Sequence, residues 1–74
     1  MAKTIEAVYK EIGKRITKER KHQGMSQERI AALSGIDRSH IGFIEQGRRK
    51  PTLSTLYKIA NVLNLSLEDF FKGL

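Results

Sequence analysis

Residues 26–45, SQERIAALSGIDRSHIGFIE, constrain the fold of this chain more than any other segment. Ser26 and Asp37 can each cap the start of a short helix, because Ser and Asp are strong N-cap residues. Gly35 stands between them, where the first helix must end and the chain must reverse, and glycine is the residue that most often ends a helix in this way. The segment therefore predicts two short helices joined by a tight turn.

Both predicted helices, at about 27–34 and 38–45, have an apolar face. The apolar residues recur at near-helical spacing and are Ile30, Ala31 and Leu33 in the first helix and Ile41 and Ile44 in the second. The residues of the second helix expected to face solvent are Arg38, Ser39, His40, Gly42 and Phe43. Because a helix-turn-helix of this shape places its second helix in the major groove of DNA, the pattern favours recognition over catalysis.

A longer helix is predicted before this segment, from about Ile5 to His22, with Thr4 as its cap and Gly24 just beyond its end. Its apolar stripe follows helical spacing and consists of Ile5, Val8, Tyr9, Ile12 and Ile16.

Two more helices are predicted in the C-terminal third. Thr52 can cap a helix whose inward face is expected to be Leu53, Leu56, Ile59, Ala60 and Leu63. Ser66 and Asp69 resemble a capping box for a short helix that contains Leu67, Phe70 and Phe71. No segment alternates with period two, so the prediction is a compact all-α domain of five helices over residues 1–74.

A chain of 74 residues supports one small core, for which oligomerisation is a common source of extra stability. The sequence contains no cysteine, and its charged N-terminus has no apolar run that could cross a bilayer. These features predict a cytoplasmic protein without a membrane partner. No His, Cys or acidic cluster has metal-ligand spacing and no Gly-rich phosphate loop occurs, so no catalytic residue, metal or cofactor is expected.

The net charge of +6 is unevenly distributed along the chain. Residues 1–24 carry seven basic and three acidic side chains, residues 25–50 carry five and three, and residues 51–74 carry two of each. This asymmetry predicts an anionic partner beside the helix-turn-helix and a neutral surface at the C-terminal end.

From about residue 10 to 71, the chain resembles the lambda-repressor-like helix-turn-helix domains of phage repressors, Cro proteins and the xenobiotic-response-element family. The matching segments are SQE, LSGIDRSHIGFIEQG, a basic loop with Pro51, and LSTLYKIANVLNLSLEDFF. The resemblance implies a transcriptional regulator that binds a near-palindromic DNA operator as a homodimer.

The resemblance also implies which residues face DNA. Base contacts are expected from the start of the second short helix, at Arg38, Ser39, His40 and Phe43. Arg can bind guanine through two hydrogen bonds and Phe can contact a thymine methyl, although burial of Phe43 against the first helix or a partner is the alternative. Gly42 is expected to let the backbone approach DNA closely. Phosphate contacts are expected from Ser26, Gln27, Gln46, Arg48, Arg49 and Lys50, with a plain N-cap as the alternative for Ser26.

In the family, an acid at the end of the second short helix pairs with an Arg of the first helix. The resemblance therefore implies an ion pair between Arg20 and Glu45, with Arg15 or Arg29 as alternative partners. Gln27 is expected to brace the second short helix as well as to contact phosphate.

The predicted dimer surface lies at about 57–74, where the net charge is zero and apolar side chains exceed the needs of one small core. Its expected members are Tyr57, Val62, Leu65, Phe71 and Leu74. The alternative is that Phe70, Phe71 and Leu74 only cap the core of a monomer.

Within the family, the stand-alone layout resembles restriction–modification controller proteins, which activate or repress transcription. A Cro-like phage or plasmid repressor and an antitoxin-type protein that acts partly through protein–protein contacts are the alternatives. Glu28 matches a position that activating relatives use to contact the RNA polymerase sigma subunit, whereas Ala32 departs from a second such position.

Overall fold

The computed structural model describes residues 3–74, which fold into five α-helices without a strand. In chain order the helices are α1 (Ile5–His22), α2 (Gln27–Ser34), α3 (Arg38–Glu45), α4 (Leu53–Leu63) and α5 (Leu67–Phe71). The all-α, five-helix prediction and its helix bounds are confirmed. The predicted domain also includes residues 1 and 2, which lie outside the described part of the chain.

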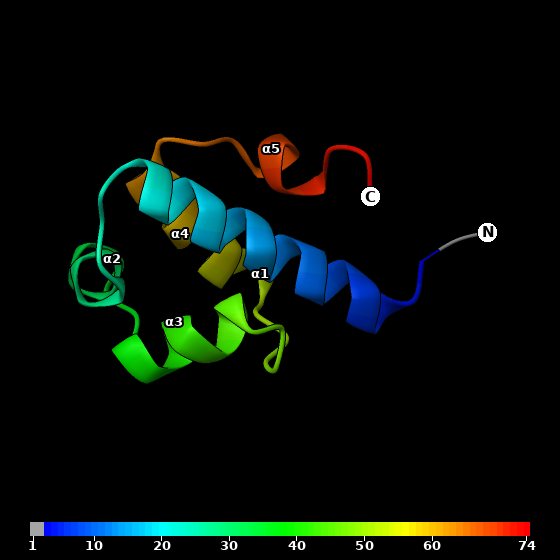
Figure 1. Cartoon of the computed structure of the whole chain (residues 1–74), viewed down its shortest axis with the longest axis horizontal. Helices are drawn as coiled ribbons and strands as arrows, with labels where there is room; N and C mark the ends of the chain where they lie inside the picture. Colours follow the sequence, from blue (N-terminus) through cyan, green and yellow to red (C-terminus); the bar gives the residue numbers. More distant parts are fainter. Residues whose placement is uncertain (1–2) are drawn as a thin grey trace.

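The long helix α1 lies between α3 on one side and α5 on the other, with α2 across the end of α3 (Figure 1). Each helix contributes at least one buried apolar side chain to a single cluster. Its members are Ile12, Ile16, Ile30, Ala31, Ile41, Ile44, Leu56, Ile59, Ala60, Leu63 and Phe70. The two isoleucines that α3 supplies to this cluster are Ile41 and Ile44, and its first two residues, Arg38 and Ser39, stay exposed.

Side-chain hydroxyls cap the first turns of α1, α2, α4 and α5 as expected, from Thr4, Ser26, Thr52 and Ser66. The predicted capping box of Ser66 and Asp69 is also confirmed. The prediction that the Asp37 side chain caps α3 is wrong, because its carboxylate makes no capping hydrogen bond. The backbone differs as well: ψ is 138° at Asp37 but 156–164° at the other four caps.

Three apolar residues expected on inward faces are exposed instead: Ile5 by 52%, Leu33 by 50% and Leu53 by 61%. Ile5 and Leu53 are the first residues of their helices, and the N-terminal end of α1 projects beyond α3 (Figure 1). At about 100° per residue, Leu33 points about 110° away from the direction midway between the two buried residues of α2. Spacing alone therefore did not identify the inward face of α2.

The turn between α2 and α3 has the expected glycine geometry. Gly35 has φ of 74°, in the left-handed region that glycine adopts at little cost, and its N–H donates to the carbonyl of Ala31 at 2.9 Å. This turn sets the direction in which α3 leaves α2.

Another glycine, Gly13, lets α1 and α3 approach closely. A Cβ atom at this position would lie 2.5 Å from the carbonyl oxygens of both Ile44 and Glu45. A contact that short with backbone atoms cannot be relieved by moving a side chain, so a larger residue would push the two helices apart. The last turn of α3 is therefore held directly against α1.

The carboxylate of Glu45, at the end of α3, is the main polar contact between α1, α2 and α3. Arg20 donates from Nε to Oε2 at 2.7 Å and from Nη2 to Oε1 at 3.0 Å, so the Arg20–Glu45 pair has the partners that the family resemblance implies. The Thr17 hydroxyl and the Gln27 amide also donate to Oε1, at 2.9 and 3.1 Å. The side chains of Arg20 and Glu45 are only 10% and 5% exposed.

These donors keep Glu45 ionised in the folded protein. Burial by itself would raise the pKa of Glu45, but hydrogen bonds from Arg20, Gln27 and Thr17 hold that pKa below its ordinary value of 4.5. The hydrogen bond to Glu45 likewise raises the pKa of Arg20. The pair is thus a charged contact in which each partner satisfies the other.

We expect Glu45→Gln to lower the free energy of unfolding by about 3 kcal/mol, because it leaves the buried guanidinium of Arg20 without its countercharge. Urea unfolding at neutral pH measures this loss. Glu11→Gln is the matched control, because Glu11 pairs with Arg15 at 3.7 Å on the surface. Exposed pairs contribute about 0–1 kcal/mol, so an equal loss in both variants would contradict the special role of Glu45.

The effect of Glu45→Gln on the free energy of unfolding should also depend on pH. Because the folded pKa of Glu45 is lowered, its stabilisation is complete above the unfolded value near 4.5 and is lost as pH falls through the folded pKa. The stability gap between the wild-type protein and Glu45→Gln should therefore shrink below pH 4.5.

Candidate nucleic-acid interface

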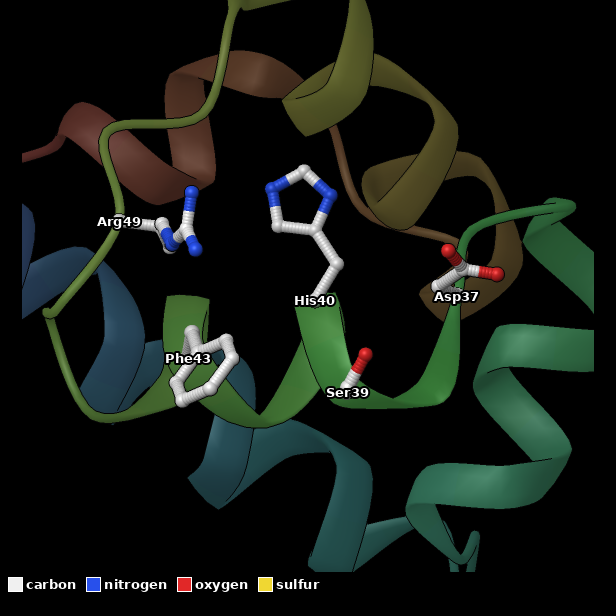
Figure 2. Close-up of a pocket in the computed structure, with 5 residues that line it drawn as sticks. All are labelled: Asp37, Ser39, His40, Phe43 and Arg49. Atoms are coloured by element: carbon white, nitrogen blue, oxygen red, sulfur yellow. The ribbon is translucent and has the colours of Figure 1, made fainter.

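Side chains from α3 and from the loop after it line one face of the molecule. Arg38 and Ser39 are exposed at the start of α3, whereas His40 and Phe43 are half-buried. Figure 2 shows His40 and Arg49 on the same side of α3, above the ring of Phe43. Together with Asp37 and Ser39, these side chains line a hollow of about 240 Å³. The structure thus brings three of the four predicted base-contacting residues, all except Arg38, together with one residue from the basic loop.

Arg38 does not point freely into solvent. Its Nε lies 3.4 Å from Oε2 of Glu28 on α2, and both side chains are more than half exposed. An exposed pair of this kind is weak and exchanges readily for another partner. Arg38 is therefore held near the start of α3 while it stays available to a ligand.

Phe43 supports the basic loop, a contact that the sequence analysis missed. The guanidinium carbons of Arg48 and Arg49 lie 6.0 and 5.4 Å from the centre of its ring. Guanidinium groups at this range are attracted to the negative face of an aromatic ring. The aromatic residue followed by two arginines within six positions was the signal that could have indicated it.

Gly42 does not face solvent as expected but is buried, and the expectation that it lets the backbone approach DNA is wrong. A Cβ at this position would lie 3.9 Å from the side-chain amide of Gln27. That amide donates to Glu45, so Gln27 connects the start of α2 to the end of α3. At that distance a Cβ would make only an ordinary van der Waals contact with the amide, so the brace does not require glycine at position 42.

Other residues expected at phosphates make contacts within the protein. Ser26 caps α2, accepting from the Arg29 N–H at 2.9 Å, as its alternative role requires. Gln46 accepts from Arg48 at 3.4 Å, and Lys50 lies 3.8 Å from Glu6 of α1. The loop residues Arg48, Arg49 and Lys50 are all exposed, so their charges are open to an anionic ligand.

The residues expected at the dimer surface fall into two groups. Val62, Leu65 and Leu74 are partly buried against the core, whereas Tyr57 and Phe71 are 56% and 40% exposed. Phe71 also lines an apolar groove of about 200 Å³, together with Ile5, Val8, Tyr9, Ile12, Pro51, Leu53 and Leu56. The apolar surface thus extends from the predicted region onto the N-terminal end of α1.

Among residues 3–74, no group of three or more His or acidic side chains is placed to hold a metal ion. In the same part of the chain, none of the helices has the length and apolar character needed to cross a membrane.

The helix-turn-helix family model matches residues 16–70. The chain is 49% identical over 59 residues to the HTH-type transcriptional regulator PuuR of Escherichia coli (strain K12), a match that covers 80% of this chain and 32% of PuuR. The chain therefore spans about a third of the length of that relative.

Two solved structures extend the comparison to the fold. The restriction-modification controller protein C.AhdI from Aeromonas hydrophila superposes with a TM-score of 0.85 at 37% identity, over 88% of this chain and 98% of that protein. SinR, a master regulator for biofilm formation solved in complex with DNA, superposes with a TM-score of 0.78 at 31% identity, over 82% and 98% of the two chains. The expected lambda-repressor-like fold is confirmed, and this protein belongs to the helix-turn-helix family.

Proposed function

We propose that this protein regulates transcription by binding operator DNA, with α3 in the major groove and the basic loop along the phosphate backbone. The observation that carries the proposal is the joint surface of α3 and the loop. It presents polar and charged side chains that can read base edges beside three exposed basic residues, Arg48, Arg49 and Lys50. The relatives support it, because PuuR is a transcriptional regulator and SinR was solved with DNA.

Each side chain of this surface has a separate role in the proposal. Arg38 exchanges Glu28 for guanine, and Ser39 and His40 bind neighbouring base edges or phosphates. Ser26, Gln27, Gln46 and the basic residues of the loop contact phosphates, which sets affinity and register without reading sequence. The thymine contact of Phe43 stays a prediction, and the two arginines over its ring support a role in orienting the loop.

The protein acts as a homodimer on a near-palindromic operator in this proposal, because one copy of α3 reads too few base pairs for useful specificity. The exposed side chains of Tyr57, Phe71 and Leu53 supply an apolar contact area. The overlap with C.AhdI supports a restriction–modification controller role. The contact of Glu28 with the sigma subunit stays a prediction, as does the choice between activation and repression.

We expect selection from random duplex DNA to enrich one half-site in inverted pairs, with centres about one helical turn apart. Binding to the enriched DNA should weaken steeply between about 50 and 200 mM salt, because each phosphate contact releases counterions. Arg48→Ala should reduce the slope of log affinity against log salt by about one. Lys72→Ala, beyond α5, is the control that should leave the slope unchanged. Failure to enrich any sequence would overturn the proposal.

Phe43→Leu keeps an apolar side chain near the groove but removes the aromatic face under Arg48 and Arg49. If Phe43 orients the loop, its replacement should weaken binding to enriched and random DNA by the same factor. Fluorescence anisotropy titrations with both duplexes measure that factor. A loss confined to one thymine-containing base pair would instead establish the thymine contact, and Arg49→Ala shows what loss of a loop arginine does alone.

We expect Tyr57→Asp to convert a dimer into a monomer and to weaken operator binding, because the change places an unpaired charge in an apolar interface. Sedimentation measures the association, and circular dichroism checks that helical content is kept. Leu33→Asp is a matched control, since Leu33 is comparably exposed but lies on α2. A wild-type protein that sediments as a monomer with and without DNA would exclude the dimer.

A further inference from the structure

Asp37 is an acidic residue at the start of the α3 surface, and no side-chain contact in the described part of the chain accounts for its charge. It lies directly before α3, it is exposed, and its carboxylate does not cap the helix. Within residues 3–74, the structure contains no hydrogen bond or ion pair to its side chain. Within the described residues, the Asp37 side chain therefore stabilises the fold neither by capping α3 nor through a salt bridge.

Three other acids, by contrast, lie next to basic side chains. Glu28 lies 3.4 Å from Arg38, Glu6 lies 3.8 Å from Lys50, and Glu45 is buried against Arg20. Each of these carboxylates has a basic partner that reduces its repulsion of a polyanion. Within residues 3–74, no basic side chain pairs with Asp37, and its negative charge stands on the surface that we propose for DNA, where it opposes non-specific binding to phosphates.

The position of Asp37 brings that charge to the base-reading side chains. It lines the same hollow as Ser39, His40, Phe43 and Arg49, and it lies at the N-terminal end of α3 (Figure 2). The first residues of a recognition helix are the ones that contact base edges. A residue one position before Arg38 is therefore within the reading segment rather than behind it.

The chemistry of a carboxylate limits what it can read. An ionised Asp accepts hydrogen bonds and donates none. In the major groove, cytosine N4 and adenine N6 are the donors, whereas guanine O6 and thymine O4 are acceptors that would repel it. Arg38 has the opposite preference, so the two adjacent side chains select bases of opposite character.

We propose that Asp37 is a specificity-determining residue that accepts a hydrogen bond from the exocyclic amino group of a cytosine or adenine in the operator. The inference rests on the proposed function, because it requires α3 to enter the major groove. Asp37 discriminates in two ways: a cytosine or adenine at the position that it faces satisfies its carboxylate, whereas a guanine or thymine at that position presents an acceptor and leaves the charge unpaired beside phosphates. Its effect is on the choice of sequence more than on overall affinity.

Selection from random duplex DNA with the wild-type protein and with Asp37→Ser tests this proposal. Serine is as good an N-cap as aspartate, so helix formation is preserved, but its short hydroxyl does not carry the charge. We expect the variant to lose about tenfold preference at one base pair of each half-site while its affinity for random DNA rises. Glu68→Ser, at an exposed position of α5, changes the net charge by the same amount and should keep the wild-type preference.

Asp37→Asn provides a second test that keeps the shape and the capping ability of the side chain. It should also relax the preference, because an amide can donate to guanine or thymine as well as accept. Failure of the wild-type protein to enrich a sequence would overturn the proposed function and this inference together. Enrichment by the wild-type protein with an unchanged base profile in both variants would overturn only the role of Asp37.

Discussion

The carboxylate of Glu45 is the contact on which the position of α3 depends. Donors from α1 and α2 converge on its two oxygens, through Arg20, Thr17 and Gln27. Loss of these donors would leave a buried carboxylate without partners and would strongly destabilise the folded protein. The three helices are therefore coupled through one charged group. Gly13 reinforces the coupling from the other side, because its missing Cβ lets the last carbonyls of α3 rest on α1.

This arrangement fixes α3 at its C-terminal end and leaves its N-terminal end open. The buried contacts of α3 are Ile41, Ile44 and the Glu45 cluster, whereas its first two residues are exposed. A recognition helix benefits from this division, because its orientation is set by the core and its reading residues remain free. In the basic loop that follows, the guanidinium groups of Arg48 and Arg49 lie over the ring of Phe43.

The helix bounds were predicted well because the residues that start and end each helix lie next to it in the sequence. Thr4, Ser26 and Thr52 sit next to the helices that they cap, and Gly35 is within the turn that requires it. Contacts between distant segments were harder to predict. The role of Gly13 depends on which helix crosses above it, and spacing along the chain does not contain that information. The Arg20–Glu45 pair was predicted only through the resemblance to a known family.

Asp37 shows how a failed local prediction can point to function. Its residue type and position favour a cap, yet the carboxylate makes no capping hydrogen bond and pairs with no basic side chain among residues 3–74. Places where sequence, backbone and hydrogen bonding disagree tend to be functional sites, because a ligand can supply the missing interaction. On a basic surface, an unpaired acid weakens binding to every sequence except one that places the amino group of a cytosine or adenine opposite it. The charge that opposes DNA in general then becomes a means of selecting one operator.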